Sequence, residues 1–422
     1  MHDHYDTRET QPPEERERQL FERLPAALEQ ARAAAPAIAH QLRGLDPAQI
    51  DSRAALVEIP VLRKSELLEA QHAARIAAQR VGRNDRKRVF GGFSAIGWGQ
   101  ARRVFASPGP IYEPEGARAD YWGFARALHA AGVRPGMLVH NCFSYHFTPA
   151  GSMMETAAHA LGCTVFPGGV GQTEQQVRVM ADLAPDVYVG TPSFLRIILE
   201  KADQMGVALP SLQCAVVSGE AFPAALQVWL RAHGITGFQA YGSADLGMVA
   251  YETEARDGLV LNENLIVEIV RPGTGQPLPE GEVGELVVTT LQPDYPLLRF
   301  GTGDLSAFLP GQSPCGRTNA RIRGWLGRAD QTTKVRGMFV HPEQVARVLA
   351  RHPRIRRARL LVSGNDGHDT MMLQVESDSA LEIDSIVQTV REETKLRASV
   401  QQVDMGSLPN DGKVIEDRRR LA

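Results

Sequence analysis

Short apolar runs alternate with amphipathic stretches between about residues 136 and 240. Each run has the length of a strand and ends in a glycine or polar turn, after which apolar positions recur at helical spacing. This repeated order of strand, turn and helix predicts a mostly parallel sheet that is covered by helices. We take the strands to be 137–139, 164–166, 187–189 and 215–217.

One helix start is marked by its residue types as well as by its period. Thr191 is a favoured N-cap, and Pro192 suits the first helical turn because its missing N–H has no partner there. The apolar residues Leu195, Ile198 and Leu199 then keep helical spacing.

The pattern differs on either side of this region. Residues 1–18 are polar and charged, and we expect them to be disordered, whereas 19–85 are rich in Ala, Leu, Gln and Arg and predict helices. After Tyr241 the pattern changes to strands and turns, and a small α+β unit follows from about Asp330. Later strands are expected at 265–270, 284–291, 298–300, 359–362 and 371–375, and later helices at 342–351 and 383–396.

The chain of 422 residues is too long for one ordinary domain. We predict an α/β fold with a large N-terminal domain, in which mostly parallel sheets are covered by helices and joined by a β-rich subdomain. A small α+β C-terminal domain follows. The predicted boundary separates residues 19–327 from residues 328–422.

Composition limits the compartment and the partners. The net charge is -3 and no basic stripe runs along the chain, which argues against nucleic acid as a partner. No apolar run approaches the ~18 residues of a membrane span, so we expect no membrane insertion. The four cysteines form no CxxC pair, and the first residues lack the apolar core of a signal peptide. We expect a cytoplasmic protein, and a homodimer is compatible with the sequence.

Four segments in the second half of the chain combine residue types that bind nucleotides. They are Tyr241-Gly242-Ser243-Ala244-Asp245, Arg299-Phe300-Gly301-Thr302-Gly303-Asp304, Gly327-Arg328-Ala329-Asp330 and Leu408-Pro409-Asn410-Asp411-Gly412-Lys413-Val414. Together they resemble the AMP-binding enzymes that activate a carboxylic acid with ATP, and most of all the phenylacetate–CoA ligase family. The resemblance extends from about Pro60 to Ile415.

The resemblance implies an acid–CoA ligase that works in two half-reactions. A carboxylate first reacts with ATP to give an acyl-adenylate and pyrophosphate, and the thiol of coenzyme A then attacks the adenylate. The implied cofactors are ATP, Mg²⁺ and coenzyme A. The implied substrate is a small carboxylic acid, of an aromatic or arylacetic kind such as phenylacetate.

The same resemblance assigns the nucleotide contacts. It places Tyr241 against the adenine. It places Asp304 at the ribose, where its carboxylate can accept hydrogen bonds from both hydroxyls. Arg328 would reach the ribose or the phosphates and is a catalytic candidate. Asp245 would hold magnesium, although the family usually has a glutamate there, whose arm is one methylene longer. The segments implied along the adenine are Ser218-Gly219-Glu220 and Tyr241-Gly242-Ser243.

Two further roles follow from the C-terminal motifs. Lys413 would stabilise charge at the α-phosphate during adenylation. Asp330 would be the hinge about which the small C-terminal domain, mobile in this family, rotates between the half-reactions.

The phosphate loop departs from the family pattern. Relatives read like Ser-Ser-Gly-Thr-Thr-Gly-Lys-Pro-Thr, whereas this chain has Ser107-Pro108-Gly109-Pro110-Ile111-Tyr112-Glu113-Pro114-Glu115. Ser107 and Gly109 remain as phosphate-binding candidates. Each proline removes a backbone donor, and Glu113 stands where a lysine is usual. Its carboxylate would repel pyrophosphate unless it turns to solvent or joins the metal.

Two explanations of the altered loop stay open. Either the chain grips the triphosphate differently, or its ATP chemistry is impaired. We favour the first, because Asp304, Arg328 and Lys413 all remain. The alternatives to a CoA ligase are therefore an adenylating enzyme with a non-CoA acceptor and a nucleotide-binding protein with impaired turnover.

Two segments are candidates for the acid pocket. Asn141 to Phe147 is rich in aromatic and polar side chains, among them Tyr145 and Phe147. A glycine-rich stretch follows the next strand and contains Gly168 and Gly169. The resemblance places both beside the acyl group, while the alternative for the first segment is ordinary packing of aromatic residues in a core.

Overall fold

The computed structural model describes residues 4–81, 86–329, 331, 333–335, 338–365 and 368–419. The chain divides into two compact units. The first unit comprises Met1–Val267, Val288–Phe300 and Leu309–Gly324. The second comprises Glu268–Val287, Gly301–Phe308 and Trp325–Ala422. The second unit includes two segments that precede residue 328, and the predicted domain boundary at 327 stays a prediction.

The N-terminal segment is ordered from residue 4 onwards, so the prediction of disorder over 1–18 is wrong for residues 4–18. Glu9 is fully buried and lies 3.2 Å from a guanidinium nitrogen of Arg126 and 3.1 Å from one of Arg317. Arg16 is buried as well and donates to the hydroxyl of Thr318. These partners lie more than 100 residues away, and local composition cannot reveal them.

Helical elements make up most of the chain before residue 90. Here the predicted helical region 19–85 is broken by turns and by one short strand. The elements are η1 (Thr7–Thr10), α1 (Pro13–Ala34), α2 (Pro36–Gln41), η2 (Pro47–Gln49), α3 (Arg53–Leu56), β1 (Leu62–Arg63), α4 (Lys64–Val81) and η3 (Arg86–Phe90).

The first unit is built on a sheet whose parallel part has the order β8-β7-β6-β4-β5. This finding confirms the predicted α/β fold. The strands are β4 (Leu138–Asn141), β5 (Thr164–Phe166), β6 (Val187–Gly190), β7 (Cys214–Val217) and β8 (Thr236–Ser243). The connecting helices are α5 (Ala125–Ala130), α6 (Ala150–Ala160), α7 (Thr173–Leu183), α8 (Pro192–Met205) and α9 (Ala224–Ala232).

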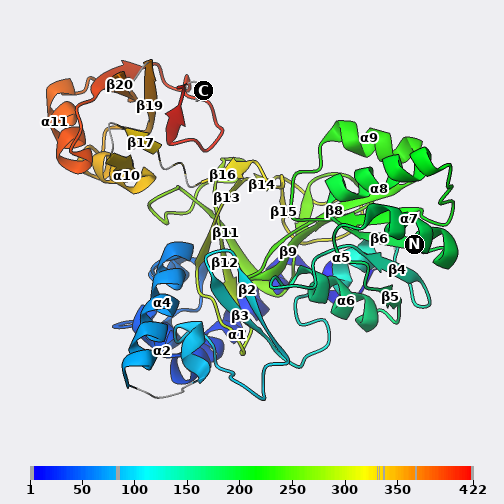
Figure 1. Ribbon diagram of the computed structural model, residues 1–422. Coiled ribbons are helices and arrows are strands. Elements are labelled where there is room, and N and C mark those ends of the chain that lie inside the picture. The colour runs from blue at the N-terminus through cyan, green and yellow to red at the C-terminus, as the bar shows by residue number, and fades with distance from the viewer. Residues whose placement is uncertain are drawn as a thin grey trace. The chain divides into compact units, whose positions relative to one another are not determined.

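Helices cover both faces of these parallel strands (Figure 1). Val187 and Val189 of β6 face α5 and α6, while Tyr188 between them faces α7 and α8. This alternation follows from the two-residue period of a strand. The predicted start of α8 is confirmed, because the Thr191 hydroxyl accepts a hydrogen bond from the backbone N–H of Phe194.

Antiparallel strands extend the same sheet beyond β8, in the order β9, β10, β15 and β14. A second sheet has the order β1-β13-β12-β11, with β16 paired to β13. A separate hairpin joins β2 and β3. The bounds are β2 (Arg103–Ser107), β3 (Ile111–Glu115), β9 (Gly247–Glu252), β10 (Leu259–Leu261), β11 (Leu265–Val270), β12 (Gly284–Thr290), β13 (Phe300–Ser306), β14 (Phe308–Leu309), β15 (Arg321–Ile322) and β16 (Gly327–Arg328).

The C-terminal part of the second unit has its own sheet, in the order β21-β20-β19-β22. Apolar residues of these strands pack with those of α10 and α11 into a separate core. The elements are β17 (Thr333–Val335), β18 (Met338–Val340), α10 (Pro342–Arg351), β19 (Arg357–Asn365), β20 (His368–Glu376), α11 (Ile383–Thr394), β21 (Ser399–Val403) and β22 (Ile415–Asp417). Among the helices described for the whole chain, none has both the length and the apolar character that crossing a bilayer requires.

Candidate functional site

The segment predicted as an altered phosphate loop is the turn of a tight hairpin. Strands β2 and β3 pair so that Ser107 lies opposite Ile111, and the three residues between them form the turn. Ser107 and Glu113 are both buried, and the serine hydroxyl donates to the Glu113 carboxylate over 2.5 Å. The backbone N–H of Ser107 also points to this carboxylate, at 3.4 Å. Glu113 therefore does not turn to solvent, and it occupies the hydroxyl that we expected to bind phosphate.

A second carboxylate lies near this pair. Asp245 follows β8 in the turn that leads to β9, and its side chain is buried. Its Oδ2 accepts from the ammonium of Lys64 at 3.0 Å, while its Oδ1 has no hydrogen-bond partner among the described residues. Burial raises the pKa of Glu113 to about 8, and the charge of Asp245 acts in the same direction. Ser107 and Lys64 act against this rise in the pKa of Glu113, but only in part.

Helix α4 braces the hairpin and brings Lys64 to it. The side-chain amide of Gln71 donates to the carbonyl of Tyr112 and accepts from its N–H, at 2.9 and 2.8 Å. A Cβ built on Gly109 would lie 3.2 Å from a methyl carbon of Leu68, so the helix packs directly on the turn. Lys64 begins the same helix, and sequence reasoning missed it because 43 residues separate it from Ser107.

The segment after β4 links several predicted site residues. The Asn141 amide donates to the Tyr145 hydroxyl and to the carbonyl of Gly151, at 2.8 Å each, and the Asn141 carbonyl accepts from the N–H of Gly169 at 2.9 Å. Burial raises the pKa of Tyr145, so this phenol stays neutral. Phe147 is 80% exposed and has a left-handed φ of 62°, an uncommon backbone state for a bulky residue.

The glycine-rich loop is held from behind by a buried polar pair. Gln176 of α7 donates to the carbonyls of Gly168 and Gly169 and contacts Nε2 of His140 at 2.6 Å. Burial lowers the pKa of His140, which stacks on Phe166. A Cβ on Gly168 would come within 2.6 Å of the Gln176 carbonyl oxygen, so only glycine fits this close approach.

The predicted adenine segments follow neighbouring strands of the sheet. Gly219, in the turn after β7, has a φ of 84°, and a Cβ there would touch Phe143 at 3.9 Å. The Glu220 carboxylate accepts the N–H of Ser193 at 2.7 Å and so caps the start of α8. Tyr241, Gly242 and Ser243 end β8, where a Cβ on Gly242 would meet the carbonyl of Gly247.

The second unit brings together the predicted ribose residues. Asp304 of β13 lies opposite Arg328 of β16, whose guanidinium donates to the Asp304 carboxylate at 2.8 Å. The indole N–H of Trp325 donates to the same oxygen at 3.1 Å, although half of this side chain is exposed. Gly303 lies under Arg328, since a Cβ there would reach its guanidinium at 2.5 Å. The sequence analysis did not identify Trp325, because this residue precedes the Gly327-Arg328-Ala329-Asp330 motif and belongs to none of the four motifs.

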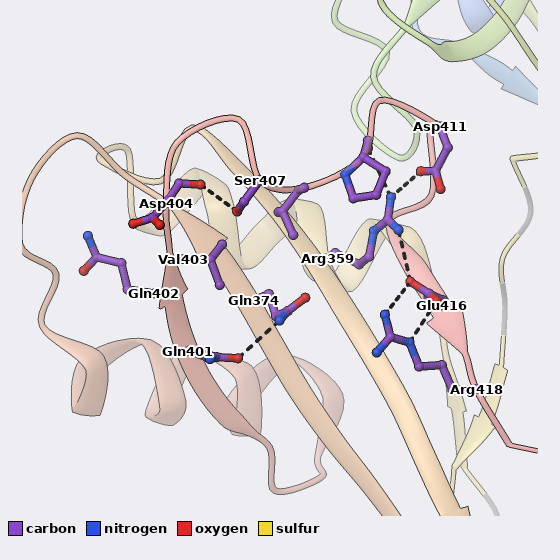
Figure 2. Close-up of a pocket in the computed structure, with 12 residues that line it drawn as sticks. Arg359, Gln374, Gln401, Gln402, Val403, Asp404, Ser407, Asp411, Glu416 and Arg418 are labelled. Carbon is purple, nitrogen blue, oxygen red and sulfur yellow. Dashed lines mark hydrogen bonds and ion pairs between the residues drawn. The ribbon is translucent and has the colours of Figure 1, made fainter.

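The lysine loop belongs to the same unit. Lys413 is exposed, and its N–H donates to the side chain of Asp411 at 3.1 Å. Figure 2 shows Arg359 between Asp411 and Glu416, and it contacts both carboxylates. A Cβ on Gly412 would lie 3.0 Å from Leu305, the residue after the ribose candidate Asp304. Asp330, the predicted hinge, lies outside the residues that the structure describes.

The predicted residues thus form two groups. In the first unit, the segment 141–147 accepts a hydrogen bond from Ala106 of β2 at the Phe147 carbonyl and one from Gly169 at the Asn141 carbonyl, and its Phe143 lies near Gly219. In the second unit, Asp304 and Arg328 are paired, and the lysine loop packs beside them. No cluster of three or more His, Cys, Asp or Glu side chains suited to a metal occurs in the described part of the chain.

Comparisons with known proteins agree with the fold and with the motifs. The AMP-binding enzyme family matches residues 119–292. A phenylacetate–coenzyme A ligase of Aromatoleum evansii is 31% identical over a match of length 354, with coverage of 80% of this chain and 76% of that protein. A phenylacetate–coenzyme A ligase of Thermus thermophilus is 36% identical over 279 residues, which cover 63% of each chain.

The solved structure of 2-hydroxyisobutyryl-CoA ligase, in the postadenylation state with R3-HIB-AMP, shares the fold with a TM-score of 0.71. It is 23% identical, and the match covers 97% of this chain and 91% of that one. The expected resemblance is therefore confirmed. The chain belongs to the phenylacetate–CoA ligase family of AMP-forming acid–CoA ligases.

Proposed function

We propose that this acid–CoA ligase activates a small aromatic or arylacetic acid such as phenylacetate. One observation carries the proposal: the segment 141–147 is hydrogen-bonded to Ala106 of the predicted phosphate-loop hairpin and to Gly169 of the glycine-rich loop, and its Phe143 lies near Gly219 of the predicted adenine segment. An acid held against this segment would lie beside the nucleotide. The names of the curated relatives support an arylacetic substrate.

A competition experiment tests the acid class. Phenylacetate, benzoate, cyclohexylacetate and hexanoate are supplied with ATP, Mg²⁺ and coenzyme A, and acyl-CoA and AMP are measured. We expect phenylacetate to be preferred over cyclohexylacetate, because a flat ring packs against aromatic side chains in ways that a puckered ring cannot. Equal rates for the two ring acids, or preference for hexanoate, would reject the aryl assignment. Acid-dependent AMP without acyl-CoA would favour a non-CoA acceptor.

We propose that Asp304 binds the ribose and that Arg328 and Trp325 hold its carboxylate in place. The paired geometry supports this role, because both partners donate to Oδ1. Arg328 is 53% exposed, so its guanidinium can also contact a phosphate oxygen. Tyr241, with Gly242 and Ser243, lines the adenine together with the segment 218–220 in this proposal.

We propose that Lys64 supplies the positive charge that the altered loop has lost. Its ammonium donates a hydrogen bond to the carboxylate of Asp245. The charge of Asp245 raises the pKa of Glu113, and Glu113 accepts a hydrogen bond from Ser107. The side chain of Lys64 is 41% exposed, which leaves its ammonium open to a phosphate in this proposal. In this proposal the backbone N–H of Gly109 is a further phosphate donor, whereas the hydroxyl and the N–H of Ser107 both point to Glu113.

Asp245 fits a magnesium ion in part. Its Oδ1 is a buried carboxylate oxygen without a hydrogen-bond partner among the described residues, and magnesium prefers such oxygens. When bound, the ion would neutralise phosphate charge. Lys64 already occupies Oδ2, which leaves Oδ1 as the donor for the ion in this proposal.

In this proposal Lys413 stabilises the charge that develops at the α-phosphate, and the small domain rotates at Asp330 between the half-reactions. The exposure of Lys413, and the packing of its loop beside Leu305, support a role close to Asp304. An exposed lysine on a glycine-containing loop can enter a site and leave it again.

A further inference from the structure

The backbone on both sides of Lys413 is held by one side chain. The amide nitrogen of Gln331 donates to the carbonyl of Gly412 at 3.0 Å. Its oxygen accepts from the N–H groups of Val414 and Ile415, at 2.5 and 2.8 Å. The three hydrogen bonds therefore bracket the lysine, one before it and two after it.

We propose that Gln331 is a positioning residue that carries Lys413 with the hinge. In the sequence it directly follows Asp330, the residue about which the small domain is expected to rotate. Gln331 and Lys413 both follow that residue in the sequence and lie in the second unit, so these hydrogen bonds would keep the lysine backbone fixed to the start of the rotating part. This inference rests on the proposed role of Lys413 in adenylation.

The sequence around the lysine explains why such a support is needed. Gly412 has a φ of 70°, and glycine loses more conformational freedom on ordering than other residues. Arg359 holds Asp411 and Glu416, which stand two residues before the lysine and three after it. Asn410 accepts the N–H of Val283 at 3.1 Å. These contacts anchor the ends of the loop, whereas Gln331 bonds the residues directly beside Lys413.

The contact itself can be measured without activity. We expect slow hydrogen exchange at the amides of Val414 and Ile415 in the full-length protein and faster exchange in Gln331→Ala, because both donors lose their acceptor. The matched control is Gln344→Ala. Gln344 also makes two backbone hydrogen bonds, to His341 and Glu393, in the same part of the chain. Unchanged exchange in Gln331→Ala, or an equal change in the control, would overturn the proposal.

The effect of Gln331→Ala on catalysis is measured in each half-reaction separately. Gln331→Ala should slow adenylate formation by roughly 10- to 100-fold, since small misplacement of a reacting group costs up to about 10²-fold. Thioester formation from a supplied acyl-adenylate should change by less than about threefold, because the proposed role of Lys413 is confined to adenylation. General damage to the fold would slow both steps instead. In Gln344→Ala both half-reactions should keep the wild-type rate.

A double-mutant cycle separates positioning from general damage. If Gln331 acts through Lys413, Gln331→Ala should slow adenylation little further in the Lys413→Ala background. Additive losses would overturn the positioning role. If Lys413→Ala alone leaves adenylation unchanged, the proposed function of the lysine fails and the positioning role fails with it. The exchange data would then still report whether the contact forms.

Discussion

At the scale of single residues, Glu113 is a clear departure from the family's phosphate-loop pattern, because it stands where a lysine is usual. A buried carboxylate beside a second carboxylate is costly when both are ionised, and here Lys64 and Ser107 compensate only part of that cost. Glu113 does not turn to solvent: it is buried and accepts a hydrogen bond from Ser107, the serine of the predicted phosphate loop.

The raised pKa of Glu113 predicts a pH-dependent stability. The folded protein keeps the Glu113 proton up to about pH 8, while the unfolded chain releases it near the ordinary pKa of 4.5. Unfolding between these values releases a proton, so the free energy of unfolding falls as pH rises, by at most about 1.4 kcal/mol per pH unit. Glu113→Gln should show a smaller fall between pH 5 and 8 in urea unfolding.

The exposed Glu58→Gln is the control for that measurement and should keep the wild-type slope. If Glu113→Gln keeps the full slope as well, Glu113 does not titrate in the way that its burial implies.

Lys64 carries a second prediction at this scale. Lys64→Ala should weaken ATP binding about 10- to 100-fold and leave Asp245 buried without its cation, which itself costs roughly 3–5 kcal/mol of stability. Lys64→Arg keeps the charge and separates the two effects. Calorimetry with ATP should therefore find near-normal affinity in Lys64→Arg. Normal affinity in a folded Lys64→Ala protein would remove Lys64 from the phosphate site.

At the scale of elements, the site depends on how α7 supports the glycine-rich loop. Gln176→Leu keeps the size of the side chain but removes its hydrogen bonds to the loop carbonyls and to His140. The loss of these hydrogen bonds to partly buried carbonyls and to the buried His140 should cost about 1–3 kcal/mol of stability. We expect KM for the acid to rise several-fold while the affinity for ATP stays unchanged.

Gln175→Leu changes the neighbouring exposed residue of the same helix and should leave both constants at their wild-type values. Steady-state kinetics at fixed ATP and at fixed acid give the two KM values. A rise in the KM for ATP, with the KM for the acid unchanged, would contradict the pocket assignment of Gly168 and Gly169.

Element types could be predicted from the sequence where a local period sets them. The helix predicted at 342–351 is α10, and the end of each parallel strand follows from a glycine or a polar turn. The hairpin of β2 and β3 could not be predicted in this way, because its two prolines and its packing against α4 hide the strand pattern. The prediction of helices over 19–85 also did not include the turns and the short strand β1 that interrupt this region.

Individual side-chain partners could be predicted only where a family motif named them. The motifs imply a ribose contact for Asp304 and a ribose or phosphate contact for Arg328, and the structure pairs the two side chains. Lys64, Trp325 and Gln331 came only from the fold, since each reaches its partner from outside the motifs or across many residues. The burial of a polar side chain could not be predicted from the sequence either, as the fully buried Glu113 shows.

At the scale of the whole molecule, the two groups of site residues belong to different units, and each unit has its own core. Such a division suits the proposed mechanism, in which one lysine serves adenylation and moves away before thioester formation. The proposed division of labour assigns the acid and the adenine to the first unit, and the ribose and the catalytic lysine to the second.

The most direct test measures phenylacetate-dependent pyrophosphate release by the wild-type protein and by Lys413→Ala, with ATP and Mg²⁺ but without coenzyme A. We predict release by the wild type and a loss of about 10²–10³-fold in the variant, as is typical when one stabiliser of transition-state charge is removed. Thioester formation from supplied phenylacetyl-adenylate should remain in both proteins. A wild-type protein that binds ATP but releases no pyrophosphate with phenylacetate or any other acid tested would contradict the account.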